Sequence, residues 1–406
     1  MTARAPRPRP GNADYVCFAA QDWWYHNRAH SDFQLMRSVA RDRRVLVVNS
    51  IGMRMPRPGV STHVTRRLAR KLGSVARLVR RPLPDLPGFH VVSPLPLPLY
   101  GTAWGRRVAA RLVRAQVRAT MWWLGMREPV VVVTVPTAWD VVRPMRRRSL
   151  VFNRSDRHSA FPEADTGTIE AMEADLLRSA DHVLYVSRSL MREEAPAAGE
   201  RGHFLDHGVD VGHFRRRPRE EWPDDVRDIP GPRVGFYGAL DDFVVDFDLL
   251  ERLAAELPEV SLVLVGDANH PMDRFDRYPN VHWLGRRPYE SIPAYGSAFD
   301  VAVMPWQDND WITHANPIKL KEYLALGLPV VSTDFAELAG YRDRVRVAST
   351  PEGFVEAVRR TLADGGPSTP ELRRASVLDC SWDSRADTLV ARAEAAPSAA
   401  EAVPSA

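Results

Sequence analysis

Short apolar runs alternate with amphipathic segments along most of the chain. Helical patterns at residues 31–42 and 169–180 lie among the strand-like runs of the first half. Strands that alternate with helices indicate βαβ units and parallel sheets. Strands are expected at residues 14–20, 44–50, 88–94, 129–135, 149–153 and 182–187, and in a second series at 232–238, 260–266, 280–285, 299–305, 328–332 and 345–348.

The two series are separated by residues 215–232. This stretch has many charged side chains, four prolines and little apolar periodicity, which is typical of a linker. The 406-residue chain also exceeds the size at which one core keeps growing, so two domains are expected. The predicted division is a disordered basic tail at 1–13, domains at 14–211 and 233–380, a linker at 212–232, a last helix at 381–396 and a disordered tail at 397–406.

One segment of the second half, residues 313–334, has unusually clear boundaries. Asn316 is a candidate cap for the first turn of a helix, and Pro317 suits the first helical position. Gly327 ends the helix, and a short β-branched strand follows directly. The apolar stripe consists of Leu320, Tyr323 and Leu324.

The face of this helix away from the stripe carries Ile318, Lys319 and Glu322. Unpaired amides and the positive end of the helix dipole suit a phosphate at the helix start. Lys319 adds a cation there, and Glu322 lies one turn further along, where its carboxylate can accept hydrogen bonds from sugar hydroxyls. The pattern favours a nucleotide diphosphate and its ribose.

This segment resembles the donor-nucleotide motif of GT-B glycosyltransferases, particularly the retaining family 4 and family 1-type bacterial enzymes of a teichuronic-acid-biosynthesis-like subgroup. The similarity includes four further stretches in family order, NADYVCFAAQDWW, ADHVLYVSRSL, HGVDVGHF and GFYGAL, and covers most of residues 14–365. It implies an α/β protein of the GT-B class, with two doubly wound Rossmann-like domains facing across a cleft. A final helix crossing back to the first domain is also implied.

The resemblance assigns further roles in the donor site. Two family glutamates stand eight positions apart; Glu322 matches the second, and His314 occupies the place of the first. His314 is a candidate to donate a hydrogen bond to the sugar or diphosphate, and the alternative interpretation is a histidine that faces solvent. Gly238 should allow a close approach to the donor, together with Ile318 and Leu320 of the motif. Trp306 and Trp311 are expected to line the donor-sugar pocket.

The same region departs from the family pattern in one respect. Family members usually carry an arginine and a lysine after the glycine turn, where this chain has Asp241, Asp242 and Asp246. Phosphate neutralisation is then expected from Lys319 and the amides at the helix start.

Residues 152–165 follow a predicted strand, where loops of such folds carry function. Asp156 and His158 are candidates to take a proton from an acceptor hydroxyl. The alternative interpretation is that Asp156 caps a turn and pairs with an arginine on the surface.

The turn after the first predicted strand lacks glycine, unlike that of many related enzymes. Asp22 is a candidate acceptor ligand, and Trp23 offers a flat face for a sugar or lipid. Packing of Trp23 beneath the loop is an equally open interpretation.

Composition is that of a globular protein, with 45% hydrophobic and 26% charged residues. Cys17 and Cys380 alone provide neither a disulfide framework nor a zinc site. The pattern predicts no bound metal and no cofactor, the nucleotide sugar being a substrate. The N-terminus has no apolar run after its basic residues, and the strongest run, 129–136, is too short to span a bilayer. We expect a cytoplasmic protein.

Charge is distributed unevenly along the chain. Residues 1–148 carry 27 basic and 7 acidic side chains, a net charge of +20, whereas the other 258 residues carry 28 basic and 44 acidic ones, a net charge of −16. A basic half attracts polyanions, which predicts peripheral association with an anionic membrane surface at the inner face. The alternative interpretation is that the arginines only solvate the protein surface. Nucleic acid is not the expected partner, because the arginines form no recognised reader motif.

The sequence therefore predicts a metal-independent, retaining glycosyltransferase of cell-envelope polysaccharide or glycoconjugate synthesis. Its partners would be a nucleotide-diphospho-sugar and a carbohydrate, lipid-linked or small-molecule acceptor. A GT-B-fold UDP-sugar epimerase and a non-catalytic sugar-nucleotide or polyanion-binding protein stay open as alternatives.

Overall fold

The computed structural model describes residues 11–26, 30–51, 73–75, 78–95, 103–161 and 165–395. The predicted tails at 1–13 and 397–406 lie almost entirely outside these ranges, as does the basic cluster at 66–71. The chain divides into two compact units. The first comprises residues 1–186, 190–205 and 385–406, and the second comprises 187–189 and 206–384.

The first unit is built on a sheet that, within the described residues, has eight strands in the order β3-β4-β2-β1-β5-β6-β7-β8. Every pair is parallel except β3 with β4. The strands are β1 (Tyr15–Phe18), β2 (Val45–Val48), β3 (Val79–Arg80), β4 (Phe89–Val92), β5 (Val130–Val133), β6 (Ser149–Arg154), β7 (His182–Tyr185) and β8 (Gly202–Phe204).

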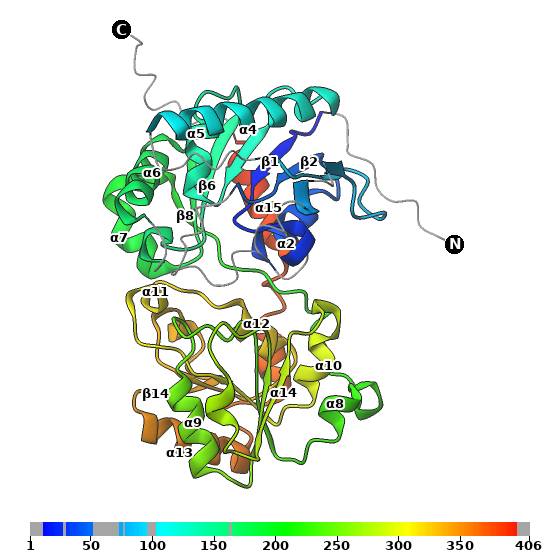
Figure 1. The fold of residues 1–406 in the computed structure, drawn as a ribbon, viewed down its shortest axis with the longest axis vertical. Coiled ribbons are helices and arrows are strands. Elements are labelled where there is room, and N and C mark those ends of the chain that lie inside the picture. Colours follow the sequence, from blue (N-terminus) through cyan, green and yellow to red (C-terminus); the bar gives the residue numbers. More distant parts are fainter. Residues whose placement is uncertain are drawn as a thin grey trace. The chain divides into compact units, whose positions relative to one another are not determined.

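Helices cover this sheet (Figure 1). They are α1 (Trp23–His26), α2 (Ser31–Val39), α4 (Ala103–Trp123), α5 (Trp139–Val142), α6 (Thr166–Ser179), α7 (Arg188–Ala198) and α15 (Trp382–Ala393), with short 3-10 turns at Pro136–Ala138, His158–Ala160 and Gly199–Arg201. Apolar side chains of α4, such as Val113 and Val117, pack with Val131 and Val133 of β5 in one core cluster. The residues of α15 from Arg385 onward belong to this unit.

The second unit is a six-stranded sheet within the described residues, in the order β11-β10-β9-β12-β13-β14, with every pair parallel. The strands are β9 (Arg233–Tyr237), β10 (Ser261–Val265), β11 (Val281–Gly285), β12 (Val301–Met304), β13 (Val330–Thr333) and β14 (Val345–Ala348). The helices are α8 (Asp224–Arg227), α9 (Phe247–Glu256), α10 (Ile292–Ser297), α11 (Asp310–Thr313), α12 (Ile318–Ala325), α13 (Pro351–Asp364) and α14 (Pro370–Ala375), and 3-10 turns lie at Arg219–Glu221, Asp273–Phe275, Tyr289–Ser291 and Ala336–Gly340.

The strand order of the second unit reverses between β9 and β12. From β9 the chain proceeds outward to β10 and β11, and it then returns to β12 and proceeds outward the other way. Ligands of such doubly wound sheets bind beyond the carboxyl ends of the strands at this reversal. The predicted α/β fold with two Rossmann-like sheets is confirmed.

The segment predicted as a linker is packed into the second unit. Phe214, Val226 and Ile229 are buried in the core cluster that also contains the strands of this unit. The segment was predicted to be a linker because it is rich in proline and charged residues. Its three buried apolar side chains nevertheless pack it against the sheet.

Candidate functional site

Gly238 directly follows β9, at the strand reversal of the second unit. Its φ of +148° is a backbone conformation that side chains disfavour. A Cβ atom here would lie 1.9 Å from Cε and 2.8 Å from Nζ of Lys319. The space beside Gly238 is therefore occupied by the stem of Lys319, and the close approach of Gly238 to the donor stays a prediction.

The ammonium of Lys319 lies 5.9 Å from the ring centroid of Trp306. Burial lowers the pKa of Lys319, and the carboxylate of Glu322 opposes this shift. A cation held over an aromatic face in a desolvated position is a strong partner for an anion that replaces the lost water.

Glu322 is 6% exposed, although the sequence placed it on a polar face. Burial raises its pKa to about 7, while Lys319 and then the Tyr237 hydroxyl lower it. The backbone N–H of Tyr237 donates to the Tyr323 hydroxyl at 3.1 Å, which fixes the end of β9 against α12. Burial thus makes the Glu322 carboxyl easier to protonate than an exposed glutamate, with Lys319 opposing this effect.

The predicted cap of α12 is wrong. Asn316 donates from Nδ2 to Oδ1 of Asp206 at 2.7 Å, and no side chain accepts from the first turn, which begins after Pro317. This contact uses the amide nitrogen of Asn316, and the residue at the cap position is Pro317, which has no side-chain acceptor. The start of α12 therefore has no side-chain cap at this position.

Leu320 does not contribute a free amide. Its N–H donates to the carbonyl of Pro317 at 3.2 Å, and its side chain is 2% exposed in the core. Ile318, half-buried in the first turn, stays a candidate for a backbone contact with a phosphate. The predicted apolar stripe of Leu320, Tyr323 and Leu324 is buried.

The two predicted sugar-facing tryptophans differ in their surroundings. Trp306 is 4% exposed and packs edge-to-face on Phe236, so most of its ring lies in the core, where it supports Lys319. Trp311 is half-buried, with its ring centroid 6.3 Å from that of Phe243. Of the two, Trp311 retains the larger exposed surface for the role that the sequence predicted.

His314 is 8% exposed, and the interpretation of a solvent-facing histidine is wrong. Its Nδ1 lies 3.1 Å from the hydroxyl of Ser189, and its Nε2 lies 3.6 Å from the carboxylate of Asp310. These contacts orient the ring at the end of α11, immediately before the loop that leads to α12.

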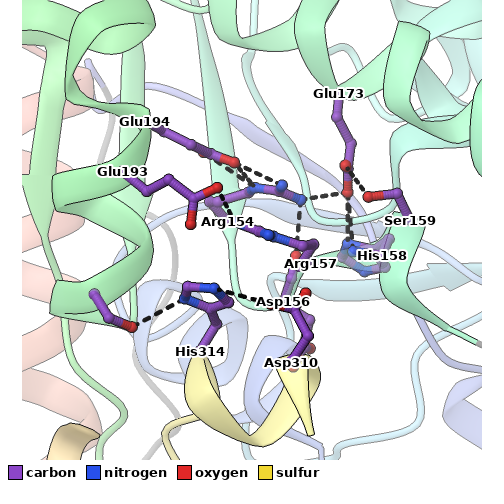
Figure 2. Close-up of polar contacts among 11 residues, drawn as sticks. Arg154, Asp156, Arg157, His158, Ser159, Glu173, Glu193, Glu194, Asp310 and His314 are labelled. Atoms are coloured by element: carbon purple, nitrogen blue, oxygen red, sulfur yellow. Dashed lines mark hydrogen bonds and ion pairs between the residues drawn. The ribbon is translucent and has the colours of Figure 1, made fainter.

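In the first unit, the carboxyl end of β6 carries a buried charge cluster (Figure 2). Arg154 is 2% exposed and lies between Glu173 and Glu194, with a guanidinium nitrogen 2.7 Å from Oε1 of Glu194. Glu173 also accepts from the backbone N–H of His158 and from the Ser159 hydroxyl, both at 2.9 Å. The cluster holds the loop after β6 in one conformation.

Asp156 projects from this fixed loop. Its carbonyl accepts a hydrogen bond from Arg154 at 2.8 Å, and its carboxylate accepts one from Ser155 at 3.2 Å. Burial raises the pKa of Asp156 to about 7; the Ser155 hydrogen bond lowers it, and Asp32 raises it. A carboxyl with this pKa is suited to accept a proton at neutral pH.

His158 differs from Asp156 in access and in basicity. It is 2% exposed, and burial followed by the charge of Arg154 lowers its pKa to about 4. An enclosed imidazole of such low basicity is a poor general base. Of the two predicted proton acceptors, the structure favours Asp156.

Asp32, at the start of α2, is a site residue that the sequence reasoning missed. It is 1% exposed and accepts hydrogen bonds from three elements, namely from Ala20 N–H at 3.0 Å, the Thr134 hydroxyl at 2.9 Å and the Asn153 amide at 3.2 Å. It therefore ties together the loops after β1 and β5 and the end of β6. No local pattern distinguishes it from an ordinary aspartate in the first turn of a helix.

Asp22 and Trp23 have structural contacts in the first unit. Asp22 accepts from the Trp24 N–H at 3.0 Å and from the Ser74 hydroxyl at 2.5 Å. Trp23 is 4% exposed and packs between Phe33 and Phe89, with centroid distances of 5.2 and 5.0 Å. The packing interpretation of Trp23 is therefore correct, and the stacking role is not available to it.

Two hollows lie within the second unit. One of ≈560 Å³ is at the carboxyl ends of β12, β13 and β14, and its lining includes Trp306, Thr333 and Arg342. A larger one of ≈730 Å³ lies at the opposite edge, where Arg233 and Asp300 precede their strands. Neither of these two hollows is lined by Lys319 or Glu322. Among the described residues, His, Cys, Asp and Glu form no group of three or more that could hold a metal ion.

The geometry agrees with comparisons to known proteins. Residues 231–364, which contain Gly238, Lys319 and Glu322, match the family model described as Glycosyl transferases group 1. Over 241 residues the chain is 26% identical to the putative teichuronic acid biosynthesis glycosyltransferase TuaH of Bacillus subtilis (strain 168). This match covers 56% of the chain and 60% of that protein.

Solved structures show the same fold at low identity. Anabaena Alr3699/HepE in complex with UDP has a TM-score of 0.64 and 15% identity, over 94% of this chain and 98% of that one. Sucrose-phosphate synthase from Thermosynechococcus elongatus has a TM-score of 0.65 and 16% identity, over 93% and 97%. The chain has the GT-B fold, and the predicted resemblance to GT-B glycosyltransferases is confirmed.

No helix in the described part of the chain is both long and apolar enough to cross a bilayer.

Proposed function

We propose that this chain is a glycosyltransferase that transfers a sugar from a nucleotide-diphospho-sugar to an acceptor hydroxyl. The observation that carries the proposal is the arrangement in the second unit, where Lys319 lies against Gly238 beside the uncapped start of α12, with Glu322 one turn further. Similarity to a group 1 model over the same residues supports this reading. Structures of HepE with UDP and with UDP-glucose, which share the fold, make UDP-sugars the first donors to test.

The proposed donor contacts follow from charge. The diphosphate would accept hydrogen bonds from the first-turn amides of α12 and an ionic contact from Lys319. These groups would stabilise the negative charge that develops on the leaving diphosphate, without requiring a metal for that purpose. Glu322 would accept hydrogen bonds from the ribose hydroxyls.

In the first unit, Asp156 is proposed to accept the proton of the acceptor hydroxyl. The Arg154 cluster holds its backbone, and its pKa of about 7 leaves a substantial ionised fraction at neutral pH. Retention of the sugar configuration is proposed from the resemblance to retaining enzymes. The acceptor is proposed to be a carbohydrate, a lipid-linked or a small molecule of cell-envelope polysaccharide or glycoconjugate synthesis, reached at the inner face of the membrane.

The acidic residues after Gly238, which replace the basic pair of the family, have structural partners. Asp241 accepts from the Phe243 N–H at 3.0 Å, and Asp246 caps α9 by accepting from the Leu249 N–H at 2.9 Å. Asp242 lies 3.4 Å from Nδ1 of His270. The charges of these three aspartates are thus engaged within the loop. This supports Lys319 and the start of α12 as the groups that bind the diphosphate.

The test begins with thermal shift and calorimetry using UDP-, GDP- and dTDP-sugars, because a ligand stabilises the state that it binds. The bound donor is then incubated with lipid and polysaccharide extracts, and the products are separated by mass spectrometry. Transfer of the sugar would support the proposal. Isomerised donor without transfer would identify an epimerase, and binding without any turnover would identify a non-catalytic binding protein.

A further inference from the structure

The longest described helix of the first unit, α4, has large apolar side chains on its outside. Trp104, Trp122 and Trp123 are 70%, 83% and 67% exposed. Three exposed tryptophans on one helix are unusual for a soluble surface, where exposed aromatic side chains gather at sites of interaction. Figure 1 shows α4 on the outside of the first unit beside α5.

Most of the exposed side chains form one row along the helix, and Trp123 lies outside it. Residues 104, 107, 111, 115, 118 and 122 are all exposed and follow one another at intervals of three or four. Ala110, Val113 and Val117, which are buried in the core, occupy the opposite side. Trp104 and Trp122 lie 18 positions apart, which is about 27 Å of helix.

Between the two tryptophans, the row carries Arg107, Arg111 and Arg118. The sequence of α4 contains five arginines and no acidic residue. Arg114 lies next to the row, three positions after Arg111 and four before Arg118, and its guanidinium donates to the carbonyl of Asp140 at 3.4 Å. Within the described residues, the three arginines of the row have no ion-pair partner at contact distance. We call residues 104, 107, 111, 118 and 122 the Trp–Arg row.

We propose that the Trp–Arg row is a docking surface for an anionic phospholipid bilayer, with its arginines on lipid phosphates and its terminal tryptophans at the headgroup level. Tryptophan favours this level because its ring is apolar and its N–H is polar. Arginine pairs with phosphate through its fork of donors. The Trp–Arg row would be the surface through which the protein associates peripherally with the membrane. This inference rests on the proposed function, which includes that association.

The charge pattern selects this partner over two others. A second copy of the same row would bring arginines against arginines, so symmetric self-association is disfavoured. Nucleic acid also attracts arginine, but a straight outer helix face with a tryptophan at each end matches a flat headgroup layer better than a groove. Leu95, 47% exposed and bonded through its backbone to Gln116 of α4, extends the apolar part of the surface.

The experiment uses the full chain and sucrose-loaded vesicles. Binding to vesicles of phosphatidylcholine alone is compared by co-sedimentation with binding to a 3:1 mixture of phosphatidylcholine and phosphatidylglycerol, from low to high salt. We expect binding to the anionic vesicles that weakens with salt, because the attraction decays within a Debye length. Neutralising each arginine should weaken it roughly fivefold.

Two variants separate the components of the row. Arg107→Gln/Arg111→Gln/Arg118→Gln should abolish the preference for anionic vesicles, and Trp104→Ser/Trp122→Ser should weaken binding at all salt concentrations. Matched controls come from the second unit. Arg359→Gln/Arg360→Gln removes exposed arginines, and Leu372→Ser removes an apolar side chain that is 58% exposed. Both controls should bind vesicles as the natural sequence does.

Several outcomes would overturn the proposal. These are equal binding to both lipids, no binding at low salt, or row variants that bind as well as the controls. Tighter arginine-dependent binding to duplex DNA at equal salt would assign the row to nucleic acid, and a dimer lost in the tryptophan variant would assign it to a protein contact. Nucleotide-sugar binding, measured by calorimetry without lipid, should be unchanged in every row variant, so failure of the donor site and failure of the row are seen separately.

Discussion

The ammonium of Lys321 lies 2.6 Å from Oδ1 of Asp206, with only 1% of Lys321 exposed. The same oxygen accepts from Asn316 at 2.7 Å. Asp206 thus holds both the middle of α12 and the loop before it. The position of Lys319 and Glu322 depends on this helix, so the pair fixes the candidate donor site without touching a ligand.

Replacing Asp206 by Asn should destabilise the second unit by about 3–5 kcal/mol, because it leaves a buried ammonium without its counter-charge. Urea unfolding followed by circular dichroism measures the loss. Adding Lys321→Met to this variant should recover most of the stability. A single Asp206→Asn variant as stable as the natural sequence would show that the ion pair does not hold α12.

Donor affinity should depend on Lys319 and Glu322. Hydrogen bonds that involve charged groups contribute about 1.5–3 kcal/mol, so Lys319→Ala and Glu322→Ala should each weaken nucleotide binding about 10- to 150-fold. Calorimetry with the donor identified above gives the affinities. Glu352→Gln, on the exposed start of α13, is a control that should bind normally. A folded Glu322→Ala variant with unchanged affinity would remove the ribose assignment.

Turnover should require ionised Asp156. With a pKa of about 7, the transfer rate should fall as the pH drops below 7 and level off above it. Asp156→Asn should reduce the rate about 10²–10⁴-fold and leave donor affinity unchanged. If this variant transfers sugar at the normal rate, another group accepts the proton.

Neighbours of Asp156 should move the pH profile in opposite directions. The Ser155 hydrogen bond lowers the Asp156 pKa, so Ser155→Ala should shift the acid limb to higher pH. The charge of Asp32 raises that pKa, so Asp32→Asn should shift the limb to lower pH. Shifts in the same direction, measured from rate profiles of both variants, would contradict the assignment of the limb to Asp156.

The free energy of unfolding should depend on pH through Glu322. Its pKa is about 7 in the folded chain, against an ordinary value of 4.5. Between these values the folded state keeps a proton that the unfolded state has lost, so this contribution falls as pH rises from 4.5 through 7, by roughly 3 kcal/mol. Glu322→Gln should therefore gain stability relative to the natural sequence at pH 8 but not at pH 4.5. Denaturant unfolding at both pH values tests this, and a constant difference would contradict the raised pKa.

The sequence predicted the sheets well because parallel strands buried on both faces are continuous apolar runs. Two short edge strands, β3 and β8, were missed, since two or three residues with mixed polarity leave no such run. Gly327, with φ of +73°, ends α12 where the sequence placed the end. A feature that depends on the backbone of a single residue, such as a glycine that ends a helix, could therefore be predicted from the sequence.

The contacts of polar side chains were much less predictable. Asn316 looked like a cap because its neighbours fit that pattern, yet its partner Asp206 is 110 positions away in the sequence. Trp23 and Trp306 follow strands as binding residues often do, but an aromatic residue after a strand packs inward just as readily. Long-range partners decided each of these cases, and a single sequence does not contain them.

The last helix has a consequence for how the chain is made. Glu394, just beyond α15, accepts from the Tyr15 hydroxyl at 2.9 Å and pairs with Arg43 at 2.7 Å, and the carbonyl of Ala393 accepts from Ser149 at 2.8 Å. Tyr15 and Ser149 thus meet these partners only after the ribosome has made residues 206–384 of the second unit. The first unit is therefore completed after the second has been synthesised, and a fragment cut at residue 205 would expose Tyr15 and Ser149 where α15 should lie.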